Sequence, residues 1–432
     1  MSLRKTKVSK KTLIITYYWP PAGGPGVQRW LKFVKYLPEF NIEPIVFIPK
    51  NPNYPIVDDS LVSEVSDEIT VINHPINEPY KWASIFSKKS SKTISKGIIS
   101  EDKAQSFIEK LLLYVRGNFF IPDARVGWVK PSVSFLLDYI KKENIDTIIT
   151  TGPPHSVHLI GLQLKEKLGV KWLADFRDPW TTIGYHKQLK LSSASAAKHK
   201  SLEKQVLNQA DQIIVTSSVT KQEFQTISEK PIEVITNGYD DEISVDFELD
   251  TKFTVSHIGS LLSKRNPDIL WRVLNELVAE NEAFSKDFQL NFVGAVSKHV
   301  LASIREYKLS GYVNNVGYVS HQEAIAYQKK SQLLVLIEID SEDTKCIIPG
   351  KLFEYMVSNR PIVALGPEGS DVEKIIKETN TGNYFSYSDS ESLKRIILEH
   401  YKAYQNKTLQ SHAVGLRKYH RKALTESLAN LL

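Results

Sequence analysis

A lysine and a glutamate three residues apart stand in the stretch IIPGKLFEYM, where Lys351 and Glu354 follow directly after Gly350. Residues at this spacing lie on one face of a helix. The amides of a helix's first turn, together with a lysine, attract an anion such as a phosphate. A carboxylate would repel phosphate, so Glu354 would instead accept hydrogen bonds from neutral hydroxyl groups, such as those of a ribose. The same two residues could also form an ordinary surface ion pair.

A second group of residues points to the same kind of ligand. In the stretch HIGSLLSKR, Gly259 ends an apolar segment, Ser260 follows it, and Arg265 stands in the next loop. Ligands of open α/β sheets bind at the carboxyl ends of strands, so we expect these residues to lie near Gly350 and Lys351. Two cations there would neutralise a doubly charged group such as a diphosphate. This convergence favours a diphosphate site over a surface ion pair.

A glycine-rich stretch in the first half of the chain, WPPAGGPG at residues 19–26, could bring backbone amides close to an anion. We expect Gly24 to approach the phosphates of a ligand, and a plain tight turn is the alternative. The dinucleotide fingerprint G-x-G-x-x-G is not present, because Arg29 stands where its third glycine should be. The second predicted strand also runs into Lys50, with no acid for a ribose. These departures disfavour an NAD-dependent oxidoreductase.

Polar residues follow two other predicted strands of the first half. His155 follows the strand at 147–151 and opens a helix, where it could act on a substrate or cap the helix. Arg177 and Asp178 follow the strand at 171–176, and charges at the end of a buried strand are costly unless they are paired or used. We therefore treat Asp178, Arg177 and His155 as candidate catalytic residues. A structural ion pair is the alternative for Arg177 and Asp178.

The elements that position these residues alternate along the chain between short β-branched strands and amphipathic helices, which predicts βαβ units and parallel sheets. Strands are expected at 12–18, 44–49, 147–151, 171–176, 213–217, 233–237, 253–259, 289–294, 314–319, 333–339 and 361–366. Helices are expected at 27–37, 156–167, 194–209, 268–280 and 321–329. Eleven strands are many for one sheet, and residues 237–252 show turn signals without a clear period. We predict two Rossmann-like domains, 1–240 and 252–405, which face each other across a cleft.

The composition of the chain limits its function. Its 432 residues contain 42% hydrophobic and 24% charged residues, which is typical of a globular protein. No apolar run reaches the roughly 20 residues of a membrane helix, and no signal peptide is evident. A single cysteine excludes an internal disulfide and suits the cytoplasm. The net charge of +6 fits phosphate-bearing ligands or anionic lipid and is too diffuse to indicate nucleic acid.

Several reaction classes lack their motifs. The sequence contains no G-x-x-x-x-G-K-[ST], H-E-x-x-H, C-x-x-C or G-x-S-x-G, which disfavours P-loop NTPases, zincins, CxxC redox sites and α/β-hydrolases. It also contains no D-x-D, which disfavours a metal-dependent sugar-nucleotide site. We expect neither a metal nor a cofactor, so cationic side chains would have to stabilise a leaving diphosphate.

The order of these motifs resembles that of retaining glycosyltransferases of the GT-B fold, specifically the bacterial members of the large GT4 family, over nearly the whole chain. The matching segments are Gly23-Gly24, Arg177-Asp178, TNGYD at 236–240, Gly259 to Arg265, GYVSH at 317–321 and PGKLFE at 349–354. The resemblance implies an α/β fold with an acceptor-binding first domain and a second domain that binds a nucleotide-diphosphate sugar. It also implies that the C-terminal segment, 406–432, crosses back to the first domain.

Residue by residue, the resemblance assigns the donor diphosphate to Arg265 and Lys351 and the ribose to Glu354. The backbone of Tyr318 and Val319 would face the base, with UDP or GDP as the expected nucleotide. Two positions depart from the family: Cys346 stands where its first glutamate contacts the sugar, and Arg177 stands where it has a histidine. The expected activity is transfer of a sugar to a glycan or lipid-linked glycan in bacterial surface polysaccharide synthesis. A non-catalytic nucleotide-sugar-binding protein is the alternative.

One segment, 82–121, lies outside the regular alternation. It is first rich in lysine and then strongly apolar: the lysines are Lys88, Lys89, Lys92, Lys96, Lys103 and Lys110, and the apolar block is 107–120. Basic residues followed by an apolar helix suggest a peripheral contact with the anionic inner face of the plasma membrane. The alternative is an insertion packed on the first domain with a solvated lysine loop.

Overall fold

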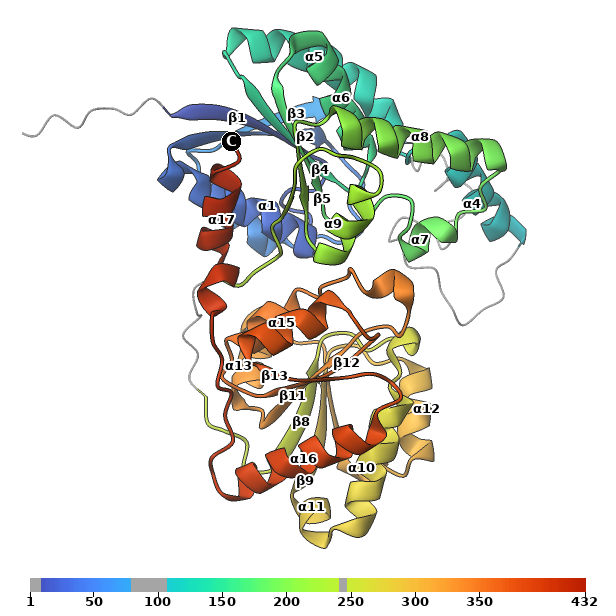
Figure 1. Ribbon diagram of the computed structural model, residues 1–432, viewed down its shortest axis with the longest axis vertical. Helices are drawn as coiled ribbons and strands as arrows, with labels where there is room; N and C mark the ends of the chain where they lie inside the picture. Colours follow the sequence, from blue (N-terminus) through green and yellow to red (C-terminus); the bar gives the residue numbers. More distant parts are fainter. Residues whose placement is uncertain (1–8, 79–106, 241–246) are drawn as a thin grey trace, which may run out of the picture. The chain divides into compact units, whose positions relative to one another are not determined.

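The computed structural model describes residues 9–78, 107–240 and 247–432, and it divides into two compact units (Figure 1). The first unit extends to Thr236 and also includes Arg421–Leu432, and the second unit is Asn237–His420. Each contains one sheet in which every described pairing is parallel. The structure thus confirms the predicted pair of Rossmann-like sheets.

The sheet of the first unit has the strand order β3-β2-β1-β4-β5-β6-β7 among the described residues. Its order reverses between β1 and β4, which is where ligands of such sheets bind. The strands are β1 (Lys10–Thr16), β2 (Ile42–Lys50), β3 (Thr70–Pro75), β4 (Thr147–Gly152), β5 (Lys171–Phe176), β6 (Gln212–Val215) and β7 (Ile232–Val234).

Helices cover both faces of this sheet, which is why its central strands are apolar on both sides. Successive residues of β1 show this, because Ile14 packs in the core under α1 while Leu13 and Ile15 pack in the core under α5 and α6. The helices are α1 (Pro25–Tyr36), α4 (Phe107–Phe119), α5 (Val129–Lys142), α6 (Ser156–Leu168), α7 (Gly184–Lys187), α8 (Ser193–Gln209) and α9 (Ser218–Gln225).

The C-terminal helix α17 (Arg421–Ala429) also belongs to the first unit and lies beside α1 (Figure 1). Its Leu424 and Leu428 are buried in the same core as Trp30 of α1. The predicted C-terminal segment, 406–432, therefore divides, because residues up to His420 lie with the second unit and only the rest lie with the first.

The sheet of the second unit has the order β10-β9-β8-β11-β12-β13, with its reversal between β8 and β11. The strands are β8 (Phe253–Ile258), β9 (Phe288–Val293), β10 (Val313–Gly317), β11 (Leu333–Ile337), β12 (Ile362–Leu365) and β13 (Gly382–Phe385). The helices are α10 (Asp268–Glu280), α11 (Glu282–Asp287), α12 (Lys298–Glu306), α13 (His321–Lys330), α14 (Lys351–Met356), α15 (Asp371–Thr379) and α16 (Ser390–Gln405).

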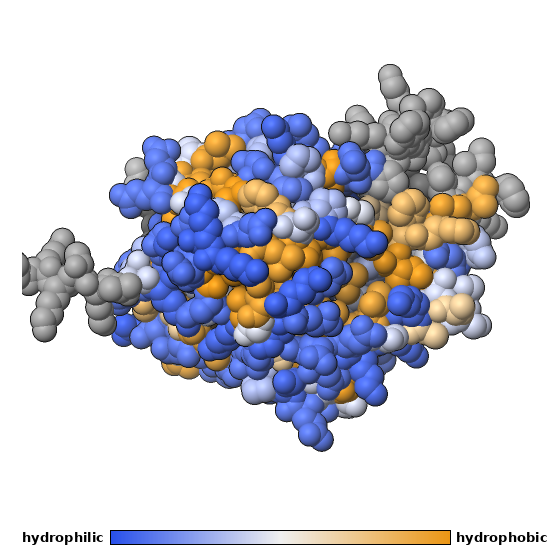
Figure 2. Space-filling view, turned by 90° about the horizontal axis from the view of Figure 1, so that it is seen from above, coloured by the Kyte–Doolittle hydropathy of each residue, from blue (hydrophilic) through white to orange (hydrophobic). Residues whose placement is uncertain are grey.

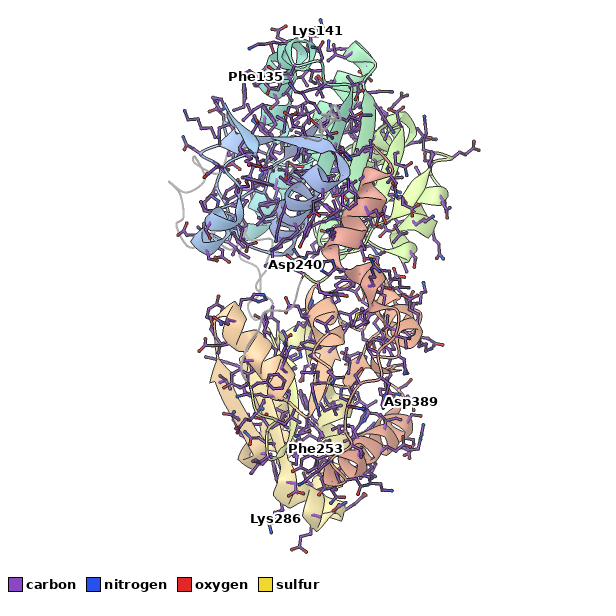
Figure 3. All side chains as sticks on the ribbon, turned by 90° about the vertical axis from the view of Figure 1, so that its left-hand side faces the viewer. Phe135, Lys141, Asp240, Phe253, Lys286 and Asp389 are labelled. Carbon is purple, nitrogen blue, oxygen red and sulfur yellow. The ribbon has the colours of Figure 1, made fainter. Side chains whose placement is uncertain are left out.

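Side chains from both units are visible in Figure 3, where Phe135 and Lys141 lie on α5 of the first unit and Phe253 opens β8 of the second. Phe253 is completely buried and packs against Tyr401 of α16, with 5.4 Å between the ring centroids. Helix α16 thus covers one face of the second sheet. Helices α14 and α15 contribute to the core on its other face.

All eleven predicted strands correspond to observed strands, and the five predicted helices correspond to α1, α6, α8, α10 and α13. Two strands, β3 and β13, were not predicted. Both lie at a sheet edge, and most of their residues are partly or fully exposed. Strands with so few buried residues lack the continuous apolar run that identifies the central strands.

Candidate functional site

Glycines line the carboxyl edge of the second sheet beside its reversal point. Gly259, Gly294 and Gly317 follow or end β8, β9 and β10, and their φ angles are 115°, 125° and 81°. A side chain is strained at such angles. An added Cβ on Gly259 would also lie 2.7 Å from the Lys351 Nζ atom. The structure therefore places Lys351 directly over Gly259.

Lys351 is the first residue of α14 and is half-buried. Its Nζ atom lies 3.3 Å from the Nε2 atom of His257. Burial and the nearby Arg265 cation lower the pKa of Lys351 to about 7, although Glu354 opposes the shift. A buried cation beside another cation is unfavourable unless an anion joins them. The pair therefore has the electrostatics of an anion-binding site.

Arg265 ends a short 3₁₀ turn, Ser263–Arg265, in the loop after β8. Burial lowers its pKa, and the carboxyl group of Glu338 partly offsets the effect. Its Nε atom is buried and has no hydrogen-bond partner among the described residues. Arg265 thus has donor capacity that the surrounding protein leaves unused.

Glu338, which sequence reasoning missed, follows β11 at the same sheet edge and is buried. Its Oε2 atom accepts hydrogen bonds from Tyr384 (2.8 Å) and Ser370 (3.1 Å). Burial nevertheless raises its pKa to about 8. An acidic residue directly after the apolar run LLVLI was the available signal, because carboxyl groups are rarely buried without a partner.

Glu354 lies one turn along α14 and does not pair with Lys351. Its Oε2 atom accepts a hydrogen bond of 2.8 Å from the side-chain amide of the buried Gln328, and its Oε1 atom lies 3.9 Å from Nε2 of His321. The alternative of a simple Lys351–Glu354 surface ion pair is therefore wrong. Gln328 fixes one carboxylate oxygen, and the other faces the half-exposed His321.

The remaining predicted donor residues differ in exposure. Ser260 is exposed, Val319 is half-buried, and Tyr318 is 94% exposed. Gly350 has ordinary helical angles with open space where a Cβ would stand. Cys346 is half-buried, with its Sγ atom 3.9 Å from the Asp343 carbonyl oxygen. Because α14 is only one to two turns long, its dipole adds less than the two cations.

In the first unit, Arg177 joins three loops at the carboxyl ends of β1, β4 and β5. Its Nε atom donates to the Gly152 carbonyl (3.2 Å), and its Nη2 atom donates to the Pro153 carbonyl. An added Cβ on Gly26 would lie 1.6 Å from its Nη1 atom. The glycine-rich loop therefore has a packing reason for Gly26, whereas Gly24 has a φ of 107° and open space around it.

Asp178 lies beside Arg177 but is not hydrogen-bonded to it. No hydrogen bond or ion pair joins its carboxylate to another described residue. Burial raises the pKa of Asp178, and the Arg177 cation opposes the shift. Because Arg177 donates to backbone carbonyls instead, the proposed Arg177–Asp178 ion pair is not formed. The carboxylate remains available to a ligand.

His155 is buried and does not cap its helix. Its ring stacks on Trp180, with centroids 4.8 Å apart and planes within 3°, and both ring nitrogens lack partners among the described residues. Its 6% exposure favours a packing role over contact with a substrate. His158, His186 and His199 are buried nearby, and we call these four residues the histidine cluster.

The histidine cluster predicts that stability falls at acidic pH. Burial lowers the pKa of His158 to about 3 and that of His186 to about 4, whereas an unfolded histidine titrates near 6.5. The stability that the neutral rings contribute is complete above about pH 6.5, and it is lost as the pH falls toward the pKa values of the folded protein. Between the unfolded and the folded pKa, each such ring lowers the free energy of unfolding by about 1.4 kcal/mol for every pH unit of acidification. Urea unfolding between neutral and mildly acidic pH measures the slope.

One variant tests this prediction and a second serves as its control. His186→Gln should reduce the acid slope, while His412→Gln, at an exposed position, should leave it unchanged. An equal slope in all three proteins would contradict a role for the histidine cluster.

Arg29 explains why the glycine fingerprint fails. Its guanidinium forms a buried ion pair with Asp175 of β5, with 2.9 Å between Nη2 and Oδ1, and also donates to the Thr236 carbonyl. Asp175 accepts further hydrogen bonds from Trp30 and Thr151. At position 29, where the dinucleotide fingerprint has its third glycine, this chain has an arginine that links α1 to the sheet.

The predicted membrane segment lies largely outside the described residues, which include none of 79–106. Within the described part, α4 exposes Leu111, Tyr114 and Phe119. On the face of the first unit seen in Figure 2, apolar residues form an irregular band among hydrophilic ones. None of the described helices is both long and apolar enough to cross a bilayer. No group of three potential metal ligands occurs among the described residues.

Comparisons with known proteins agree with this geometry. Residues 98–243 match the model of Glycosyltransferase Family 4, and residues 252–403 match that of Glycosyl transferases group 1. No curated protein matches the chain. Similar solved structures include sucrose-phosphate synthase from Thermosynechococcus elongatus, with 14% identity, a TM-score of 0.62 and 98% of each chain covered.

Two further structures contain nucleotide ligands. A TarM variant from S. aureus in complex with fondaparinux, alpha-GlcNAc-glycerol and UDP is 14% identical, with a TM-score of 0.56 over 98% of this chain and 99% of that chain. Anabaena HepE in complex with UDP-glucose is 12% identical, with a TM-score of 0.54 over 98% and 94%. At such identities the likeness shows the fold alone. The two consecutive domain matches, on two parallel-sheet units of this fold, identify the chain as a GT4-like glycosyltransferase of the GT-B fold.

Proposed function

We propose that the protein transfers a sugar from a nucleotide-diphosphate donor, UDP- or GDP-linked, to a glycan or lipid-linked glycan, with retention and without a metal ion. The observation that carries this proposal is the pair of half-buried cations Lys351 and Arg265. Lys351 lies over Gly259, and the Nε atom of Arg265 has no hydrogen-bond partner among the described residues. UDP and UDP-glucose in two structurally similar proteins support the choice of donor class.

The predicted donor-side residues have these roles in the proposal. Lys351 and Arg265 neutralise the charge that develops on the leaving diphosphate, an effect for which one donor is worth about 3–4 kcal/mol of barrier. Glu354, held by Gln328, accepts from the ribose hydroxyls. Ser260, Gly350 and the backbone of Tyr318 and Val319 complete the donor side.

In the first unit, Asp178 orients an acceptor hydroxyl, and Arg177 holds the loops around it. Gly24 provides a side-chain-free backbone for the donor phosphates. Bacterial surface-glycan synthesis, a cytoplasmic location and peripheral contact with anionic membrane remain predictions.

Thermal-shift measurements with UDP, GDP, ADP, CMP and NAD test the donor class, because a ligand that binds only the folded protein stabilises it. UDP or GDP should stabilise the protein, and the corresponding sugar donor should then be hydrolysed slowly. Stabilisation by NAD alone would contradict the proposal. Binding without turnover on any acceptor would favour a non-catalytic sugar-nucleotide-binding protein.

Lys351→Ala should weaken UDP binding by about 1.5–3 kcal/mol, the value of a hydrogen bond to a charged group, and leave uridine binding nearly unchanged. Glu354→Gln is the matched control on the same face of α14. Glu354→Gln should weaken the binding of UDP and of uridine by a similar free energy, because Glu354 contacts the ribose that both ligands contain. Calorimetric titration of both ligands measures these changes. An equal loss of UDP and uridine affinity in Lys351→Ala would mean that Lys351 has only a structural role.

A further inference from the structure

The buried ring of His257 connects Lys351 to the strands of the second sheet. His257 lies in β8 and is 2% exposed. Its Nδ1 atom lies 3.1 Å from the carbonyl oxygen of Val335 in β11, and its Nε2 atom lies 3.3 Å from Nζ of Lys351. His257 therefore belongs to one strand at the reversal point, contacts the other strand, and also contacts the cation of the proposed donor site.

The partners of the ring determine which nitrogen carries the proton. A carbonyl oxygen can only accept a hydrogen bond, so Nδ1 of His257 donates to Val335. A neutral imidazole then has its lone pair on Nε2, which accepts from the Lys351 ammonium. The opposite tautomer would place an N–H against the ammonium and a lone pair against the Val335 carbonyl.

The charges around His257 keep the ring neutral. Burial and the Lys351 cation hold its pKa well below the ordinary value, with Arg265 acting in the same direction and the Val335 and Ser260 backbone opposing. The charged groups that act on Lys351 are Arg265 from the loop after β8 and Glu354 from its own helix. An imidazolium would therefore face two cations.

Gly259 allows the ammonium to approach the strand end closely, since a Cβ there would lie 2.7 Å from Nζ. Among the described residues, His257 is the one hydrogen-bond partner of Lys351. A lysine side chain otherwise has large rotamer freedom, which a ligand must restrict when it binds. The hydrogen bond to the ring removes part of that freedom in advance.

We propose that His257 is a positioning residue, which accepts a hydrogen bond from Lys351 and holds its ammonium ready for the diphosphate of the donor. The assignment of the ligand rests on the proposed function. The arrangement of His257, Lys351 and Val335 does not.

Calorimetric titrations of the full-length chain with UDP and with uridine test the proposal. His257→Phe keeps a ring but removes both hydrogen bonds, and it should weaken UDP binding about tenfold, the effect of roughly one hydrogen bond, while uridine binding is unchanged. His257→Gln can again present an acceptor toward Lys351, and it should recover most of the affinity. Circular dichroism and melting curves confirm that each variant is folded.

A double-mutant cycle separates positioning from a general structural effect. Residues that act through one another are non-additive. His257→Phe should therefore change UDP affinity little in a Lys351→Ala background. An equal loss in both backgrounds, or an equal loss of uridine affinity, would overturn the proposal.

The pH dependence gives an independent readout. Removing the acceptor disfavours the charged lysine, so the UDP affinity lost in His257→Phe should be larger at about pH 8 than at about pH 6, on either side of the Lys351 pKa of about 7. A loss that does not change with pH would contradict the proposal.

Acetylation of the Lys351 amine, followed by mass spectrometry across pH, needs no nucleotide. The midpoint of its reactivity should fall in His257→Phe and return toward the original value in His257→Gln. An unchanged midpoint would overturn the positioning role even if UDP binds. Failure of the unmodified protein to bind any nucleoside diphosphate would instead contradict the proposed function, while the acetylation result would still decide whether His257 holds Lys351.

Discussion

Asp178→Asn is expected to lower turnover by about two orders of magnitude or more, the usual effect of removing a group that orients or deprotonates a reacting hydroxyl. Its carboxylate is half-buried, follows β5, which is the strand next to β4 at the reversal point, and has no hydrogen bond to another described residue. Because all the predicted donor residues except Gly24 lie in the other unit, UDP affinity should change by no more than a few fold. Initial rates and UDP titrations on the same preparation measure both quantities.

Asp67→Asn is a suitable control, since Asp67 is an exposed carboxylate of the same unit. It should leave turnover unchanged. If Asp178→Asn instead lowers the melting temperature by many degrees, with a proportionate loss of activity, the residue has a structural role and the acceptor assignment fails.

Arg29→Ala is expected to destabilise the first unit by about 3–5 kcal/mol, because it leaves the Asp175 carboxylate buried without its cation. Both side chains are at most 1% exposed, and the Arg29 guanidinium also binds the Thr236 carbonyl. The ion pair holds the pKa of Asp175 below its ordinary value even though burial opposes this. Urea unfolding followed by tryptophan fluorescence measures the loss.

Arg395→Ala provides the comparison on the surface. Arg395 pairs with Glu399 at 3.0 Å, but both side chains are more than half exposed. Such a pair contributes about 0.2–1 kcal/mol. Similar small losses in both variants would mean that water or backbone rearrangement satisfies Asp175 once Arg29 is removed.

The interior strands could be predicted from the sequence because burial on both faces produces continuous apolar runs. Residues 333–337, LLVLI, are a clear example, and every one of them is buried. The edge strand Gly382–Phe385 could not be predicted in this way, since only Phe385 is fully buried. Its position depends on pairing with β12, which is a property of the tertiary structure.

The donor side of the site was predictable in part for a similar reason. Gly259 and Lys351 belong to short local patterns whose chemistry is readable, and the structure places them together. His257 and Glu338 were missed because each stands within or directly after an apolar strand and gains its role only from neighbours distant in sequence. The histidine cluster comes from three separate segments, so no local pattern could reveal it.

The position of α17 has a consequence for biosynthesis. Domains generally fold as units, with N-terminal ones first as they leave the ribosome. In this chain the second unit is inserted between Thr236 and Arg421 of the first. Leu424 and Leu428, which fill the core beside Trp30, are therefore synthesised only after the whole second unit. Until α17 is synthesised, the nascent first unit exposes an apolar surface on α1. The unit that is translated first is therefore the last to be completed.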